Sequence, residues 1–362
     1  MPFAAKKSRK TQRARAATLA DVGREAGVSA MAASAVLNGA RTSSRISEKT
    51  RKRILKAATK LSYRPNFAAR ALASRRMHTI GVAAVIEEGE LNHYFLEVFN
   101  GILGAAAHHG QNTTVFSLRN WHADAVRLQT FCDGRIDGLI LLAPTCERGE
   151  VLLPPHIPYV SIHSNTRLQG VVNIESDEEH GALAMVTLLI AHGHRRIMHL
   201  AGPPGLIGTV RRLKAYKHAL AAARSPYSSD LLLTAGYSQE EARRVMGDWL
   251  ASHTGRPLPQ AIFCANDAVA LGCMEALAKA GIRVPDDVSV AGFDDTLGAR
   301  MSIPQLSSVR QPLRAMGERA VELLLANLDH KAERRPESVV FPVDIVKRTS
   351  VATPPATTRK GR

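Results

Sequence analysis

The sequence has few of the features that mark secreted, membrane-spanning or metal-binding proteins. Its 362 residues include only four cysteines, with no CxxC pair and no cysteine–histidine spacing typical of a zinc site. It begins without the apolar run of a signal peptide, and none of its apolar runs approaches the ~18 residues that cross a bilayer. We therefore expect a protein of the reducing cytoplasm with buried cysteines, no bound metal, no cofactor and no membrane partner.

Acidic residues are scarce in only one part of the chain. Residues 1–78 hold nineteen Lys or Arg against three acidic residues, whereas residues 79–362 hold 29 of each, so the whole net charge of +16 lies in residues 1–78. Such a surface attracts polyphosphate and releases condensed counterions on binding. An anionic membrane is the alternative, but residues 1–78 contain no Trp and only two Phe to insert into one. The charge distribution favours a nucleic-acid partner.

Residues 18–39 predict two short helices joined by a tight turn. The first helix has apolar residues at helical spacing, at Leu19, Val22 and Ala26. Gly27 can end this helix with a positive φ, and Ser29 can cap the second. A helix, a turn of three residues and a second helix form the helix-turn-helix pattern, whose second helix enters the major groove of DNA. An ordinary helical hairpin is the alternative that the pattern leaves open.

Basic segments flank this pattern on both sides. Residues 1–17 carry six basic and no acidic residues, and we predict a disordered arm that either contacts phosphates or only aids solubility. A third helix is expected after Ser47, with its buried side formed by Ile54, Leu55, Ala58 and Leu61. Residues 66–78 then predict a fourth helix, short and basic, which has too little apolar surface to be stable alone.

From Thr79 onward, apolar strand-like segments alternate with helical ones. The strand-like segments are TIGVAAVI, TTVFSL, GLILLAP, IPYVSIH, RIMHLAG, LLLTAG, AIFCAN and VSVAGF, with a last one at SVVFPVDIVKR. This alternation predicts βαβ units and parallel sheets. Because a second series begins at Glu178, we expect residues 79–348 to form two doubly wound subdomains with a cleft between them. The tail, residues 349–362, should be loose.

The order of these segments resembles the LacI/GalR family of bacterial transcription repressors. The matching motifs span residues 18–348 and include AGVS, VLNG, SYRPNFAARALASRR, TIGV, RIDGLIL, HGHRRI, RRLKAY, FCANDAVALG, VPDDVSVAGFDD and PQLSSVRQP. The resemblance implies an all-α helix-turn-helix domain over 18–65, then a hinge helix over 66–78. It also implies a periplasmic-binding-protein-like effector module whose chain crosses between lobes three times. The implied partners are operator DNA at the nucleoid, a small-molecule effector and a second copy of the chain, as a homodimer or a tetramer.

The resemblance places particular residues at the DNA. The predicted DNA-binding residues are Thr18, Leu19, Ser29, Ala30, Met31, Ser34, Ala35, Asn38, Arg64, Asn66, Arg70 and Leu72. Ala30, Met31 and Ala35 fall where the family reads bases, and Leu72 where it inserts a minor-groove wedge. Packing of Leu72 on its own domain is the alternative.

The second helix departs from the family pattern. The usual threonine-valine-serine-arginine is replaced by Ala32 to Ala35, and none of Ala30, Met31 and Ala35 can form a bidentate bond to a base edge. Each such bond is worth ~1–3 kcal/mol of discrimination. We therefore hypothesise that this chain depends more on phosphate contacts, the arm and the hinge than its relatives do.

The same resemblance places an effector between the two lobes. The predicted effector-binding residues are Tyr94, Phe95, Arg212, Tyr237, Asn266, Asp294 and Gln311. Polar side chains of these types bind hydroxyls, aromatic rings pack on apolar ring faces, and the carboxyl ends of strands are where α/β sheets hold ligands. Asp267 is expected to cap the following helix instead, and a surface salt bridge is the alternative for Arg212. A sugar is the first expectation for the effector, and a purine or nucleoside the second.

Two further classes of function compete with a repressor. A doubly wound carbohydrate- or nucleotide-acting enzyme with a basic appendage would need a Walker, Rossmann or nucleophile-elbow motif, and the chain contains none. A periplasmic binding protein would need a signal peptide. The pair His192 and His194 suggests a metal, but no third ligand is suitably spaced. The sequence therefore predicts a ligand-responsive DNA-binding regulator that is not an enzyme.

Overall fold

The computed structural model of the protein divides into two compact units between Met77 and His78. It describes residues 16–38, 46–65, 70–71, 76–86, 92–124, 126–145, 153–166, 168–328 and 338–354. The predictions for most of the basic arm, for Asn66, for Leu72 and for the end of the tail lie outside the described residues. Within the described part of the chain, no helix is long and apolar enough to span a bilayer.

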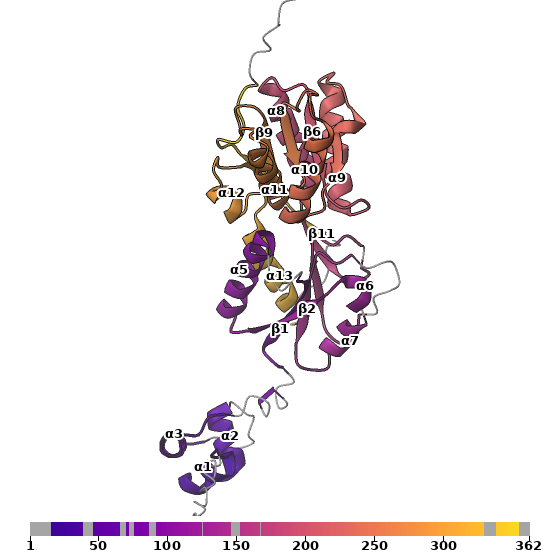
Figure 1. The fold of residues 1–362 in the computed structure, drawn as a ribbon. Coiled ribbons are helices and arrows are strands. Elements are labelled where there is room, and N and C mark those ends of the chain that lie inside the picture. Colours follow the sequence, from indigo (N-terminus) through magenta and orange to yellow (C-terminus); the bar gives the residue numbers. More distant parts are fainter. Residues whose placement is uncertain are drawn as a thin grey trace, which may run out of the picture. The chain divides into compact units, whose positions relative to one another are not determined.

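Three helices form the described part of the first unit (Figure 1). They are α1 (Leu19–Ala26), α2 (Ala30–Asn38) and α3 (Glu48–Lys60). Gly27 ends α1 at φ +63°, and the Ser29 hydroxyl accepts a 3.1 Å hydrogen bond from the Ala32 amide at the start of α2. The predicted turn and N-cap are therefore confirmed. The buried core is small and consists of Val22, Ala26, Ala33, Ile54, Ala57 and Ala58.

The prediction for one core residue of this unit is wrong. Leu55 is 48% exposed, and Ala57 takes a place in the core instead. The reason is helical spacing, because Ile54, Ala57 and Ala58 are separated by three and four residues and share one face. Leu55 follows Ile54 directly, so it is turned by about 100° from that face.

Two six-stranded sheets, each within its own lobe, form the second unit. The first lobe has the strand order β11-β5-β4-β3-β1-β2, all parallel, from β1 (Thr79–Val85), β2 (Asn112–Leu118), β3 (Gly138–Leu142), β4 (Tyr159–Ile162), β5 (Val172–Ser176) and β11 (Ser338–Phe341). The second lobe has the order β12-β10-β9-β8-β6-β7, from β6 (Ile197–Ala201), β7 (Leu232–Thr234), β8 (Ala261–Cys264), β9 (Ser289–Asp294), β10 (Ser307–Arg310) and β12 (Asp344–Val346). Only β12 runs antiparallel to its neighbour. The predicted doubly wound α/β class is confirmed.

Helices cover both faces of each sheet (Figure 1). The first lobe has α5 (His93–His108), α6 (Trp121–Asp124), α7 (Arg127–Phe131) and α13 (Leu313–Leu328). The second has α8 (Glu178–Ala191), α9 (Ile207–Ala222), α10 (Gln239–Ser252), α11 (Asp267–Lys279) and α12 (Leu297–Met301). A separate hydrophobic core lies on each face, so each lobe has two.

The close contact between α5 and α13 depends on glycine. A Cβ at Gly101 would lie 2.0 Å from the Arg314 carbonyl oxygen, and one at Gly317 would lie 2.3 Å from the Val98 carbonyl oxygen. Real Cβ atoms do not approach backbone oxygen so closely. The two helices therefore pack backbone to backbone, which ties the C-terminal helix α13 to the first lobe.

The chain passes between the lobes three times, as the family resemblance implies. It crosses between β5 and α8, between β10 and α13, and between β11 and β12. The structure differs from the sequence prediction in two respects here. The last strand is not one strand but two, β11 and β12, which belong to different sheets. The sequence reading also missed β5, whose residues alternate between buried and partly buried.

Candidate functional site

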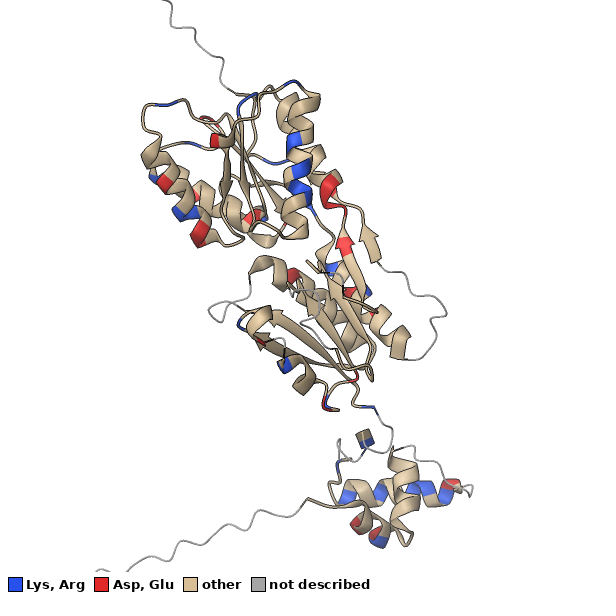
Figure 2. Cartoon of the chain, turned by 90° about the vertical axis from the view of Figure 1, so that its right-hand side faces the viewer, with Lys and Arg blue, Asp and Glu red and all other residues tan. Residues whose placement is uncertain are grey.

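The second helix of the first unit presents a nearly uncharged surface. Ala30 and Met31 are exposed, Met31 by 71%, whereas Ala33 is fully buried and Ala35 is half-buried. No charged residue lies on α2, while α3 carries most of the basic side chains of the described helices of the first unit (Figure 2). The predicted base-facing residues Ala30 and Met31 are therefore accessible, but they offer only apolar contact.

Several polar residues predicted to bind DNA also have local structural roles. Thr18 is the N-cap of α1 and forms a capping box with Asp21: the Thr18 amide donates to the Asp21 carboxylate at 2.9 Å, and the Asp21 amide donates to the Thr18 hydroxyl at 3.3 Å. The Asn38 amide donates to the Ser34 hydroxyl at 3.3 Å. Both residues are half-buried at the inner side of α2. These contacts fix the ends of the two helices.

The basic residues after α3 are differently placed. Arg64 and Arg70 are exposed, while Leu19 is half-buried against the core of the unit. Asn66 and Leu72 lie outside the described residues, so the hinge prediction stays a prediction.

In the second unit, unusual backbone conformations gather where strands end. Ala143 follows β3 at φ +47°, His163 follows β4 at φ +49°, and Asp294 ends β9 at φ +117°. Positive φ is uncommon for residues other than glycine and is concentrated at functional sites. These positions are the carboxyl ends of parallel strands, where doubly wound sheets bind ligands.

A chain of hydrogen bonds joins the two lobes at this edge. The Tyr94 hydroxyl lies 2.6 Å from His163 Nδ1, and His163 Nε2 lies 3.2 Å from the Ser176 hydroxyl. Ser176 in turn donates to the Gln311 side-chain oxygen, and Gln311 Nε2 donates to Asp294 Oδ1 at 2.6 Å. Ser176 and Gln311 lie at two of the three crossings. The chain therefore runs from α5 of the first lobe to β9 of the second.

The direction of these hydrogen bonds fixes the tautomer of His163. Because the Ser176 hydroxyl donates to Gln311, it accepts from His163 Nε2. A neutral His163 then has a free lone pair on Nδ1, which accepts from the Tyr94 hydroxyl. Burial lowers the pKa of His163 and raises the pKa of Tyr94, so both groups stay neutral near pH 7.

Arg212 is buried at the same edge. Its guanidinium donates to the Glu178 carboxylate at 2.6 Å and to the Ala265 carbonyl oxygen, and it lies 3.9 Å above the ring of Phe293. The alternative of a surface salt bridge is therefore wrong, because Arg212 and Glu178 have side-chain exposures of only 7% and 6%. Burial alone would raise the pKa of Glu178, yet Arg212 holds it below its usual range.

The remaining predicted effector residues line the same region or support it. The Tyr237 hydroxyl lies 2.9 Å from that of Thr209, and Asn266 donates to the Tyr237 carbonyl oxygen at 3.3 Å. Asn92 caps α5, which places Tyr94 and Phe95 in its first turn with their rings 5.3 Å apart. We call these two neighbouring polar groups, the hydrogen-bond chain and the buried ion pair, the interlobe cluster: Tyr94, His163, Ser176, Glu178, Arg212, Asp294 and Gln311.

Asp267 does not cap α11, contrary to expectation. Asn266 is the cap, since its side chain accepts a 2.8 Å bond from the Val269 amide. Asp267 is fully buried and instead accepts hydrogen bonds from Thr296 and Ser308 at 2.6–3.0 Å. Burial raises its pKa to about 7. Asp267 thus joins three segments of the second lobe.

Three members of the interlobe cluster were absent from the sequence predictions. His163 directly follows β4, Ser176 ends β5, and Glu178 begins α8. The alternating pattern of residues 172–176 was the available signal, since it would have located β5 and with it Ser176. Nothing in the sequence alone marks Glu178 as the partner of Arg212, 34 residues further on.

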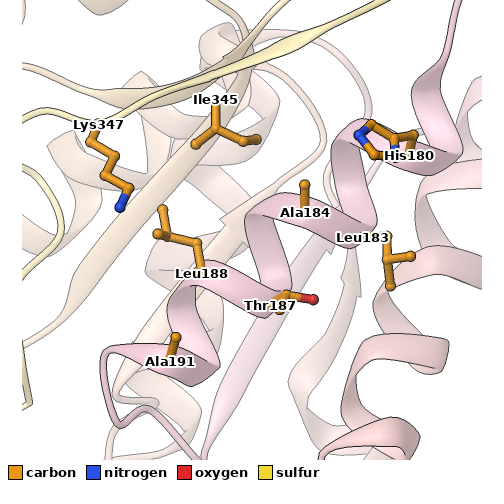
Figure 3. A pocket seen from close by; sticks show the side chains of 8 residues that line it. All are labelled: His180, Leu183, Ala184, Thr187, Leu188, Ala191, Ile345 and Lys347. Carbon is orange, nitrogen blue, oxygen red and sulfur yellow. The ribbon is translucent and has the colours of Figure 1, made fainter.

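A shallow apolar groove also lies on the second lobe, on the outer side of α8. It has a volume of about 480 Å³ and is lined by residues from His180 to Ala191 together with Ile345 and Lys347 (Figure 3). None of the predicted effector-binding residues lines it. Among the described residues, no group of three or more His, Cys, Asp or Glu side chains could hold a metal ion.

A helix-turn-helix unit joined to a two-lobed α/β module with a polar interlobe cluster defines a class of DNA-binding regulators. Comparisons with known proteins agree with this class. A family model described as bacterial regulatory proteins, lacI family, matches residues 18–66, and one described as a periplasmic binding protein-like domain matches residues 186–351.

Full-length relatives make the assignment specific. The HTH-type transcriptional repressor PurR of Vibrio parahaemolyticus is 30% identical over 339 residues, covering 92% of this chain and 98% of the relative. The probable HTH-type transcriptional repressor ExuR of Bacillus subtilis is also 30% identical over 339 residues, covering 91% and 98%. The chain therefore belongs to the LacI family of bacterial transcriptional repressors, whose members are DNA-binding proteins and not enzymes.

Solved structures of the family share the fold. A lac repressor dimer bound to operator and the anti-inducer ONPF matches with a TM-score of 0.80 and 27% identity, covering 93% of this chain and 100% of that one. The transcriptional regulator CelR in complex with cellobiose matches with a TM-score of 0.65 and 27% identity, covering 92% and 99%.

Proposed function

We propose that this repressor changes its affinity for operator DNA when a small molecule binds at the interlobe cluster. The observation that carries the proposal is the hydrogen-bond chain from Tyr94 to Asp294. It passes through two of the three crossings, so a ligand that inserts into it acts on the relative arrangement of the lobes. A coupling free energy of ~1–3 kcal/mol would change operator affinity about 5- to 150-fold.

The effector we favour is a sugar. Arg212, Asp294, Asn266 and Gln311 supply the donors and acceptors that hydroxyl groups need, and the neighbouring rings of Tyr94 and Phe95 can pack on an apolar ring face. Among the relatives, CelR is described in complex with cellobiose, which supports a sugar, whereas the name PurR keeps a purine as the second candidate.

We further propose that the protein acts as a homodimer in the cytoplasm at the nucleoid. Large apolar side chains are exposed on α5 and around α12: Leu96, Leu103, Leu297, Met301 and Ile303. These two elements touch, because Arg300 of α12 forms a 2.5 Å ion pair with Glu97 of α5. Exposed apolar side chains on two elements that touch support a subunit interface there. The lac repressor relative is described as a dimer.

At the DNA, the proposal keeps the predicted reliance on phosphate contacts. The uncharged surface of α2 supports it, since Ala30 and Met31 are exposed without a hydrogen-bonding side chain. Thymine methyl groups and DNA shape are then what α2 can recognise. If a single base change at the centre of each half-site costs several kcal/mol of binding free energy, this part of the proposal is wrong.

The proposed function is tested by measuring operator binding with fluorescence anisotropy. Promoter DNA from upstream of the protein's own gene should bind with a steep salt dependence, log K falling by about 0.9 per log unit of salt for each phosphate neutralised. A panel of sugars and nucleobases is then added. We expect at least one of these compounds to change operator affinity and to raise the melting temperature of the protein. Failure of any DNA to bind at low salt would overturn the proposal.

A further inference from the structure

The charges around Arg212 form a continuous series of ion pairs. Glu175 lies 2.9 Å from Arg211, Arg211 lies 3.9 Å from Glu178, and Glu178 lies 2.6 Å from Arg212. Two carboxylates thus alternate with two guanidinium groups. The series spans the lobes, since Glu175 is on β5 and both arginines are on α9. Its net charge is zero before any ligand binds.

The position of Glu178 is built into the fold. Gly208, in the first turn of α9, leaves the space for its carboxylate: a Cβ there would lie 2.7 Å from Glu178 Oε1. Arg212 is also fixed, because its guanidinium contacts the Ala265 carbonyl oxygen and the ring of Phe293. Neither the Glu178 nor the Arg212 side chain can move away from the other without losing several contacts.

Arg212 still has a donor to offer. Its Nε is buried and has no hydrogen-bond partner among the described residues. A ligand hydroxyl can accept from such a donor while the Glu178 pair stays intact. A ligand carboxylate, in contrast, would lie near the Glu178 carboxylate and would find a guanidinium that is already neutralised.

We propose that Glu178 is a specificity-determining residue that makes the interlobe cluster select uncharged, hydroxyl-bearing effectors and reject carboxylates. This inference rests on the proposed function, because it assumes that the effector binds at this cluster. The geometry of the pair carries it, and the electrostatics agree. Burial raises the pKa of Asp294 well above its usual range, so no free positive charge is needed to balance it. His163 stays neutral because burial lowers its pKa.

The first experiment uses the wild-type protein without DNA. Its melting temperature is measured with increasing sodium acetate, and sodium chloride at equal ionic strength is the reference. It is then measured with two matched pairs of compounds, galactose with galacturonate and glucose with glucuronate. We expect no saturable stabilisation by acetate and no stabilisation by either acid. Saturable stabilisation by acetate, or a larger effect of an acid than of its neutral partner, would overturn the proposal.

The second experiment removes the charge of Glu178 from the Glu178–Arg212 pair. In Glu178→Gln, the guanidinium of Arg212 loses its counter-charge, so affinity for acetate and galacturonate should rise by at least about tenfold, as expected for a charge-assisted contact. Glu179→Gln is the matched control, because Glu179 is exposed and pairs with Lys214 at 2.8 Å. It should leave anion binding as in the wild type.

A second variant covers the case in which Glu178→Gln does not fold. Gly208→Ala keeps every charge but pushes its new methyl group against the Glu178 carboxylate. It should raise acetate affinity by a smaller factor. A folded Glu178→Gln, or failing that a folded Gly208→Ala, with wild-type anion binding would contradict the proposal. Operator binding is measured separately, so loss of the proposed function appears as an absent DNA response and not as a changed anion preference.

Discussion

The two units of this chain use charge in opposite ways. The first unit holds the whole positive excess of the sequence, and its described core has six buried residues, four of them alanine. The second unit has no net charge, yet it buries an arginine and a glutamate of its second lobe against each other. Exposed charges of one sign attract a polyanion at long range, whereas a buried pair discriminates between ligands at short range.

The units also differ in what stabilises them. In the first, side-chain caps at Thr18, Ser29 and Ser47 fix the helix ends, because so little apolar surface is buried. In the second, four hydrophobic cores and the close α5–α13 contact hold the lobes. Substitutions should therefore cost most where groups are buried, and four predictions test this in order of size.

The largest effect is expected for Arg212→Met. It leaves the Glu178 carboxylate buried without its partner, which should lower the free energy of unfolding of the second unit by ~3–5 kcal/mol. Urea unfolding followed by circular dichroism measures this. Lys214→Met, which breaks an exposed pair with Glu179, should change the same quantity by no more than about 0.5 kcal/mol. Equal losses of unfolding free energy in the two variants would show that the buried ion pair contributes no more to stability than the exposed one.

Gly317→Ala should rank second. The added methyl group would meet the Val98 carbonyl oxygen and force α5 and α13 apart, at a cost of ~1–3 kcal/mol. Gly104→Ala on α5 is the matched control, because nothing lies within 4 Å of its Cβ position, and it should stabilise the helix by about 0.5–1 kcal/mol. We expect the melting temperature to fall in Gly317→Ala and to rise in Gly104→Ala, each relative to the wild type. A stabilising Gly317→Ala would contradict the backbone-to-backbone contact.

Thr18→Ala tests the first unit. Loss of the capping box should cost ~1 kcal/mol of stability in that unit. Thr18→Ser keeps a hydroxyl and should restore it, as judged by hydrogen exchange at the amides of α1. If the alanine variant is as stable as the wild type but binds DNA weakly, then Thr18 acts at the DNA and not as a cap.

The smallest effect concerns Arg64, which is exposed in the first unit. If it contacts a phosphate, Arg64→Gln should weaken operator binding equally for all sequence variants and reduce the salt slope by about 0.9. Arg314→Gln removes an exposed arginine of the second unit and should change neither quantity. A loss confined to one operator sequence would instead indicate base recognition by Arg64.

Much of the fold could be predicted from the sequence because its signals are local. The turn at Gly27 and the cap at Ser29 follow from neighbouring residues, and the structure has both. The predictions failed where a signal spans elements. The segment 338–348 has one continuous apolar pattern, but its two halves pair with β5 and β10 in different sheets.

The candidate site divides in the same way. Four residues of the interlobe cluster, Tyr94, Arg212, Asp294 and Gln311, were predicted by resemblance to the family, and their role in effector binding stays a prediction. His163, Ser176 and Glu178 were not, and Asp267 was given the role that Asn266 has.

The sequence by itself determined the helix-turn-helix, the division of charge between the units and the alternation of strands and helices. These properties depend on residues within a few positions of each other, or on composition. Only the tertiary structure decided that Tyr94 reaches His163, that Gln311 reaches Ser176 and that Glu178 neutralises Arg212, over separations of 69, 135 and 34 residues. Such contacts depend on strand order and on how the elements of a lobe pack, and the contact between Gln311 and Ser176 also depends on the crossings between the lobes.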